Sequence, residues 1–260
     1  MSASLDDQSF EHRIFNNKAE LVEARPELYE QIRYCVYYEA EEGMRQVAEN
    51  FSVRVIDGDL NVAHPEDYEG STFDRVLDAM GMKDWQETFL VFTGNLTLER
   101  SLGLGDRYER VVVCGDFSAG GVVNDWGTLF VLGETRISGV LYFCSDNGGF
   151  TGLRLAEPVH LIATQSNLFD VRLRSKYFFD PIFSGFEGES NSVHDENIRA
   201  AFDGTARVVS IEELASHFGQ YDESVGEEIR SGQHYKWITQ VALFGDPRKF
   251  IGKFELPATK

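Results

Sequence analysis

Acidic and amide side chains directly follow four glycines in the middle of the chain. These positions are Asp59, Asn95, Asp116 and Glu134, and Asp57 stands just before the first of the glycines. If the four positions stack, pairs of carboxylates would lie about 5 to 9 Å apart, which is the separation that glycoside hydrolysis uses. The same residue types also favour tight corners, because their side chains accept hydrogen bonds from nearby backbone groups. We favour corner packing and predict no catalytic residues.

The sequence contains no recognisable pattern for metal binding, disulfides, cysteine catalysis or phosphate binding. The 6 histidines and 3 cysteines stand apart, without the spacing of a zinc site, a disulfide framework or a catalytic cysteine. The glycines around Gly103 lack the strand-to-helix context and the Gly-Lys-Ser/Thr ending of a phosphate-binding loop. The sequence therefore predicts no metal, no cofactor and no enzymatic activity.

A fourfold repeat must position the corner residues. Each copy is an apolar β-type run, a glycine and a short alternating run, and the copies span residues 53–62, 89–98, 110–119 and 128–137. Third runs follow at 101–105, 121–124 and 139–143. Such units are too short to bury their own apolar face and must stack on their neighbours. The pattern predicts a mainly β, α+β protein built on a short right-handed parallel β-helix, with an antiparallel sandwich as the alternative. We expect the corner glycines to adopt positive φ.

Helical segments flank and interrupt the repeats. We divide the chain into a helical N-terminal cap (1–50), a β-helix domain (51–180) with a helical insertion at about 63–86, and an acidic α/β C-terminal extension (181–260). Capping patterns predict helix starts at Asn17, Ser71, Ser210 and Ser224. We expect the N-terminal segment to pack over an end of the β-domain, because an uncovered end invites polymerisation.

The formal net charge of −19 limits the kinds of partner that the protein can bind. A field of this sign repels nucleic acids and anionic membranes and attracts a basic protein, although acidity also serves solubility alone. No apolar run is long enough to cross a membrane, and the N-terminus lacks the features of a secretory signal. The expected setting is cytoplasmic, with a basic protein as partner, no nucleic acid, no membrane, and a monomer or homodimer as the assembly.

Acidic and aromatic residues of the flanks and loops are the candidate partner contacts. The carboxylates of this set would attract the basic partner, and the aromatic side chains would be buried as anchors in the interface. The set comprises Glu39, Glu41, Glu42, Trp85, Trp126, Tyr142, Glu187, Glu189, Asp195 and Glu196.

The repeats carry a Gly-Asp-Leu-x-Val pattern, matched best by residues 56–62, 91–98 and 112–118. This pattern resembles that of the bacterial polymer-forming, bactofilin-like family. Similar repeat proteins with helical extensions serve as immunity proteins against polymorphic toxins. The resemblance implies a coil shape, and the acidic helical extensions argue against a filament. We predict an immunity protein that neutralises a cognate toxin by occlusion; a structural, polymer-forming scaffold is the alternative, and a carbohydrate-active enzyme ranks third.

Overall fold

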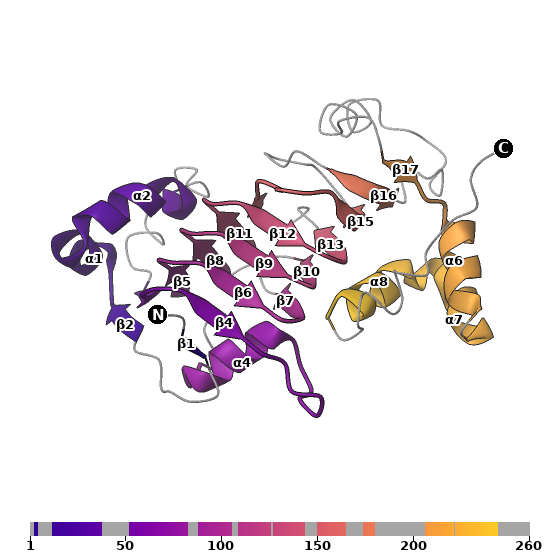
Figure 1. Cartoon of the computed structure of the whole chain (residues 1–260), viewed down its shortest axis with the longest axis horizontal. Coiled ribbons are helices and arrows are strands. Elements are labelled where there is room, and N and C mark those ends of the chain that lie inside the picture. The colour runs from indigo at the N-terminus through magenta and orange to yellow at the C-terminus, as the bar shows by residue number, and fades with distance from the viewer. Residues whose placement is uncertain are drawn as a thin grey trace.

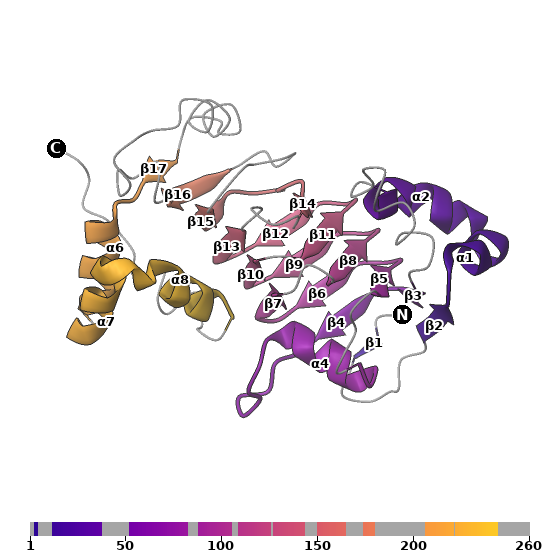
Figure 2. The same cartoon turned by 180° about the vertical axis from the view of Figure 1, so that it is seen from behind.

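The computed structural model describes residues 3–4, 12–37, 52–82, 88–105, 109–125, 127–143, 150–164, 174–179, 206–220 and 222–243. Within these residues the chain is a mixed α/β protein whose strands form three sheets with mainly parallel pairing (Figures 1 and 2). The one antiparallel pair among the described strands joins β2 to β3. An antiparallel sandwich, the alternative drawn from the sequence, is therefore wrong.

From β5 (Thr88–Phe92) to β13 (Val140–Phe143) the chain visits the three sheets in a fixed order: first, second, third. The first sheet holds β2 (His12–Phe15), β3 (Ser52–Ile56), β5 (Thr88–Phe92), β8 (Arg110–Val113), β11 (Thr128–Val131) and β14 (Phe150–Gly152). The second holds β1 (Ala3–Ser4), β4 (Leu60–Val62), β6 (Leu96–Leu98), β9 (Phe117–Ala119) and β12 (Thr135–Ile137). The third holds β7 (Ser101–Leu104), β10 (Gly121–Asn124), β13 (Val140–Phe143), β15 (Val159–Thr164), β16 (Ser175–Phe179) and β17 (Arg207–Val208). All four predicted repeats thus contribute one strand to the first sheet and one to the second, and the predicted third runs form strands of the third.

Apolar side chains from all three sheets meet in one central cluster. Equivalent positions of successive repeats stack in register: Val111 pairs with Leu90 and Leu129, and Val122 with Leu102 and Leu141. All of these side chains are fully buried. Each buried aliphatic side chain stabilises the fold by roughly 1.5 to 3 kcal/mol, so the stacking of aliphatic side chains from successive repeats holds the repeats together.

Helix α4 (Thr72–Ala79) fills the place where the first repeat lacks a third strand. Its Phe73 and Val76 are fully buried in the central cluster, and the Phe73 ring meets that of Phe92 edge-on at 6.4 Å. The Thr72 hydroxyl oxygen accepts hydrogen bonds from the backbone N–H groups of Arg100 and Ser101, each at 3.1 Å. The helix therefore closes both the core and the edge of β7.

A buried histidine completes this closure. His64 Nδ1 lies 3.2 Å from the Thr72 hydroxyl oxygen, whose lone pairs already face two backbone donors. The hydroxyl proton must then point to Nδ1, which places the histidine proton on Nε2. Burial lowers the pKa of His64, in keeping with a neutral ring that accepts this bond.

Replacing Thr72 by valine should remove the acceptor and leave the Ser101 N–H unsatisfied. We expect the free energy of unfolding to fall by about 2 kcal/mol and hydrogen exchange of the Ser101 amide to accelerate. Thr72→Ser is the control, because it keeps the hydroxyl and loses only a methyl group, at about 1 kcal/mol. Equal exchange rates of the Ser101 amide in the two variants would contradict the proposed closure.

The N-terminal helices cover a sheet face. Helices α1 (Lys18–Ala24) and α2 (Pro26–Tyr37) bury Leu21 and Ile32 against the outer side of the first sheet, where they join Phe89, Val91 and Val112. Figure 1 shows both helices beside β5 and β8. The prediction that this segment packs over an end is only partly right: β2 pairs with β3 and forms the edge of the first sheet, but the helices follow the apolar outer face of the sheet.

The C-terminal helices cover the outer side of the third sheet. They are α6 (Ile211–Gly219), α7 (Glu223–Glu228), a π-helical turn η1 (Ile229–Gln233) and α8 (His234–Leu243). At the start of α8, the His234 ring lies 5.4 Å from that of Phe179 on β16. At its end, the Leu243 carbonyl accepts a hydrogen bond from the Ser101 hydroxyl of β7 at 2.8 Å. Helix α8 therefore crosses the sheet from β16 to β7.

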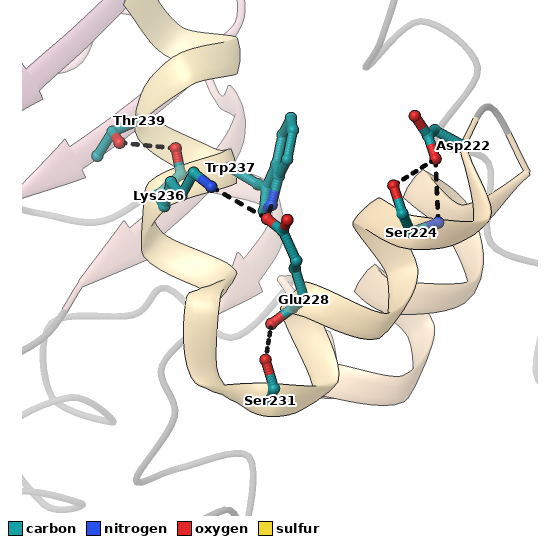
Figure 3. Close-up of polar contacts among 7 residues, drawn as sticks. All are labelled: Asp222, Ser224, Glu228, Ser231, Lys236, Trp237 and Thr239. Carbon is teal, nitrogen blue, oxygen red and sulfur yellow. Dashed lines mark hydrogen bonds and ion pairs between the residues drawn. The ribbon is translucent and has the colours of Figure 1, made fainter.

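Three of the four predicted helix caps are confirmed. The side chains of Asn17, Ser71 and Ser210 each accept a backbone hydrogen bond at the start of their helices. The cap predicted at Ser224 is wrong: Asp222 is the N-cap of α7, and its carboxylate accepts from the Ser224 N–H at 3.0 Å and the Ser224 hydroxyl at 2.7 Å (Figure 3). An ionised acceptor forms the stronger bond, so the serine becomes a donor.

Hydrogen bonds connect α7 to α8 across the kink between the two helices (Figure 3). Glu228 Oε2 accepts hydrogen bonds from Lys236 Nζ at 3.0 Å and from the Trp237 indole N–H at 3.1 Å. The kink itself depends on Gly232, whose φ of 101° is in the left-handed region. These contacts hold the C-terminal helices as one layer.

Candidate partner-binding surface

None of the described helices packs on the outer side of the second sheet. The parallel registers align four outward side chains in one row, and a corner column runs beside this row. The row is Asn61, Thr97, Ser118 and Arg136, and the column is Asp59, Asn95, Asp116 and Glu134. We call these eight residues the open face. In both views of the molecule, α1 and α2 lie beside the first sheet and α8 beside the third. Helix α4 lies beside β4, and no labelled helix lies over β6, β9 and β12 (Figures 1 and 2).

Side chains of the open face are polar for a structural reason. Along β4, β6 and β12 the residues before and after the row position are buried and the row residue is exposed. Successive strand side chains point to opposite faces, so the apolar neighbours enter the central cluster and the row faces outward. The result is a flat, polar surface bordered by carboxylates.

The corner column is a ladder of side-chain to backbone hydrogen bonds. Asp59 Oδ1 accepts from the Asn95 N–H at 2.8 Å, Asn95 Oδ1 from the Asp116 N–H at 2.7 Å, and Asp116 Oδ1 from the Glu134 N–H at 2.8 Å. Each corner side chain thus satisfies a backbone donor of the following repeat. The predicted corner-packing role is confirmed by these bonds.

Lack of space explains the glycine that precedes each of the later corner residues. A Cβ atom on Gly115 would lie 2.5 Å from Asn95 Oδ1 and 2.6 Å from the Gly94 backbone, and one on Gly133 would lie 2.6 Å from Asp116 Oδ1. Among the corner glycines of the four repeats, only Gly58 has positive φ, at 87°. The expectation of positive φ at every corner is therefore wrong: three of these positions need glycine because the ladder occupies the Cβ site.

Cations neutralise most carboxylates of this corner. Arg136 Nη2 lies 2.8 Å from Glu134 Oε2, and Arg136 Nη1 lies 3.7 Å from Asp116 Oδ2. Arg25 donates to both carboxylate oxygens of Asp57 at 2.9 and 3.0 Å, and it holds the pKa of Asp57 below its usual range. Asp59 is exposed and has no ion pair with any described residue.

Of the residues predicted to contact a partner, Tyr142 is the one that the structure describes. It is 2% exposed, its ring lies 5.3 Å from that of Tyr235 on α8, and its hydroxyl donates to Asp125 at 3.3 Å. A partner would reach this ring only after displacing α8. The other predicted contacts lie outside the described residues: Glu39, Glu41, Glu42, Trp85, Trp126, Glu187, Glu189, Asp195 and Glu196.

The open face itself was not predicted as a site, although the sequence contains a signal for it. The middle residue of each short second run is polar, as in Leu96-Thr97-Leu98, while the first and third runs are apolar at most of their outward positions. Outward polarity confined to one sheet marks the face on which none of the described helices packs.

Within the described part of the chain, no group of three or more histidine, cysteine or acidic side chains could hold a metal ion. None of the described helices is long and apolar enough to cross a membrane. No family model, curated protein or solved structure matches the chain.

Proposed function

We propose that this chain binds a basic protein through its open face and, most specifically, that it is an immunity protein that neutralises a cognate toxin by occlusion. The observation that carries the proposal is the uneven covering of the three sheets. Within the described part of the chain, the N- and C-terminal helices pack on the outer sides of the first and third sheets, whereas the outward positions of the second sheet are polar, at least partly exposed and edged by carboxylates. Uncovered sheet faces with complementary charge are suited to docking.

The scaffold proposed for this function is a short right-handed parallel β-helix whose faces are the three sheets. The regular return of the chain to each sheet and the parallel register between repeats support this form. At the N-terminal end, the antiparallel strand β2 and helix α4 occupy the positions where a further parallel repeat would stack. Blocked edges favour a scaffold that ends, over one that polymerises.

Binding would begin with electrostatic steering. A chain of net charge −19 attracts a basic surface over a distance of about one Debye length, roughly 8 Å at physiological salt. The short side chains of Asn61, Thr97 and Ser118 in the row would then permit close approach of the partner's backbone or side chains. The open face would then cover the surface of the toxin that docks on it, and this covering would occlude the toxin.

Coexpression with a basic protein encoded beside its gene tests this function. We expect rescue of growth and purification of a stoichiometric complex. The variant Thr97→Lys/Ser118→Lys should weaken that complex at least tenfold, since each exposed charge pair contributes roughly 0.2 to 1 kcal/mol and the added side chains also obstruct docking. Ser216→Lys/Gln220→Lys on the exposed side of α6 adds the same charge elsewhere and should leave affinity within about twofold.

Two outcomes would contradict the proposal. Equal loss of affinity in both lysine variants would mean that net charge alone drives binding, and not the open face. Filaments that grow with protein concentration in light scattering would instead support the polymer-forming scaffold.

A further inference from the structure

Within the open face, the guanidinium of Arg136 already binds to carboxylates of the same face. Arg136 projects from the row and reaches the carboxylates of two successive corner positions, Glu134 of its own repeat and Asp116 of the preceding repeat. Asp116 serves two contacts at once: Oδ1 accepts the Glu134 N–H, and Oδ2 faces the guanidinium. The ladder and the cation therefore use different oxygens of one carboxylate.

The equivalent step at the first two repeats keeps one of the two carboxylates, Asp59, and has the neutral Asn95 at the position of Glu134. No described cation forms an ion pair with Asp59. Asp59 Oδ1 accepts the Asn95 N–H at 2.8 Å, as Asp116 Oδ1 does for the next repeat. The residue that matches Arg136 is Thr97, which pairs with Asn61 as Arg136 pairs with Ser118. Threonine supplies no positive charge, and Arg25, the cation of the neighbouring corner, is bound to both oxygens of Asp57.

We propose that the Asp59–Asn95 step is the site for an arginine of the basic partner, which would take the place that Arg136 takes two repeats later. This inference rests on the proposed function and specifies the partner's chemistry. Arginine suits the step better than lysine, because its planar group can donate to Asp59 Oδ2 and to the Asn95 amide oxygen together. One side chain of the partner would thereby fix the register of the complex along the strands.

Three single variants test the site with matched charge changes. Asp59→Asn removes the charge and keeps the ladder, since Asn95 shows that an amide oxygen accepts the same backbone bond. Asp116→Asn makes the same change at a carboxylate already served by Arg136. Thr97→Arg supplies a guanidinium from within the chain and should fill the site.

The probe is a hexa-arginine peptide, with hexalysine for comparison, titrated into the full-length protein and followed by amide NMR signals. We expect the Asn95 and Thr97 amides to shift with hexa-arginine, and affinity to fall about fivefold in Asp59→Asn and Thr97→Arg but less than twofold in Asp116→Asn. Equal losses in Asp59→Asn and Asp116→Asn, or shifts confined to other regions, would overturn the site. Hexalysine binding as tightly at the same amides would overturn the preference for arginine.

The proposed function fails separately from this inference. If the lysine pair on the open face abolishes the toxin complex while Asp59→Asn binds the toxin as the parent chain does, the surface is right and the arginine site is wrong. If hexa-arginine maps to Asn95 and Thr97 but the basic protein encoded nearby neither binds nor is neutralised, the site stands and the immunity function falls.

Discussion

Gly115→Ala should lower the free energy of unfolding by about 3 kcal/mol, the upper range for overpacking a site that cannot relax. The added Cβ would lie 2.5 Å from Asn95 Oδ1 and 2.6 Å from Gly94 backbone atoms. Backbone atoms of a stacked repeat cannot move aside without breaking the hydrogen bond from the Gly115 N–H to the Gly94 carbonyl, at 3.1 Å. Urea unfolding followed by circular dichroism would measure the loss.

Gly105→Ala is the matched control. No heavy atom lies within 4 Å of a Cβ built on Gly105, and its φ is not in the left-handed region. We expect a change within about 0.5 kcal/mol of the parent, because exposed substitutions away from special features have small effects. Similar stability of the two alanine variants would show that the corner can relax and that the ladder does not require glycine.

Phe73→Ala should cost about 4 kcal/mol, as other buried phenylalanine truncations do. The Phe73 side chain is fully buried in the central cluster and closes the end of the core beneath the first repeat. Its loss would leave a cavity bordered by Phe92, and the surrounding strands, fixed by their hydrogen bonds, can close it only partly. The free energy from urea unfolding gives the size of the effect.

Ile14→Ala provides the comparison for an apolar truncation. Ile14 is 50% exposed on the edge strand β2, so its removal should change stability by about 0.5 kcal/mol or less. A Phe73→Ala loss as small as that of Ile14→Ala would mean that α4 covers the core only loosely.

Repetition made the strands predictable. A short unit that cannot bury its apolar face alone must place the same residue types at the same points of each copy, so the runs at 53–62, 89–98, 110–119 and 128–137 disclosed both their strands and the glycines between them. The corner column was predictable for the same reason. Its geometry follows from stacking, and in all three hydrogen bonds of the column a side-chain Oδ1 accepts from the backbone N–H of the next corner residue.

Placement of the helices was less predictable, because it depends on contacts between distant segments. The apolar face of α2 predicts burial of Ile32 but does not specify whether an end or an outer face of the sheet receives it. Likewise, Ser224 had the spacing of a cap, and only the position of the Asp222 carboxylate decides which side chain accepts the bond. The open face escaped prediction since it is defined by what the helices leave uncovered.

Because α8 crosses the third sheet from β16 to β7, its length must match the number of repeats, although the repeats lie far from α8 in the sequence. Its 10 residues extend about 15 Å, while the strands from β16 to β7 lie four spacings apart, or about 19 Å. The His234 ring contacts Phe179 on β16, and the Leu243 carbonyl contacts Ser101 on β7. Deleting or duplicating one repeat between these strands would move β16 or β7 out of reach of one helix end. Relatives with more or fewer repeats should therefore carry a C-terminal helix of correspondingly different length, so that the two segments change together in evolution.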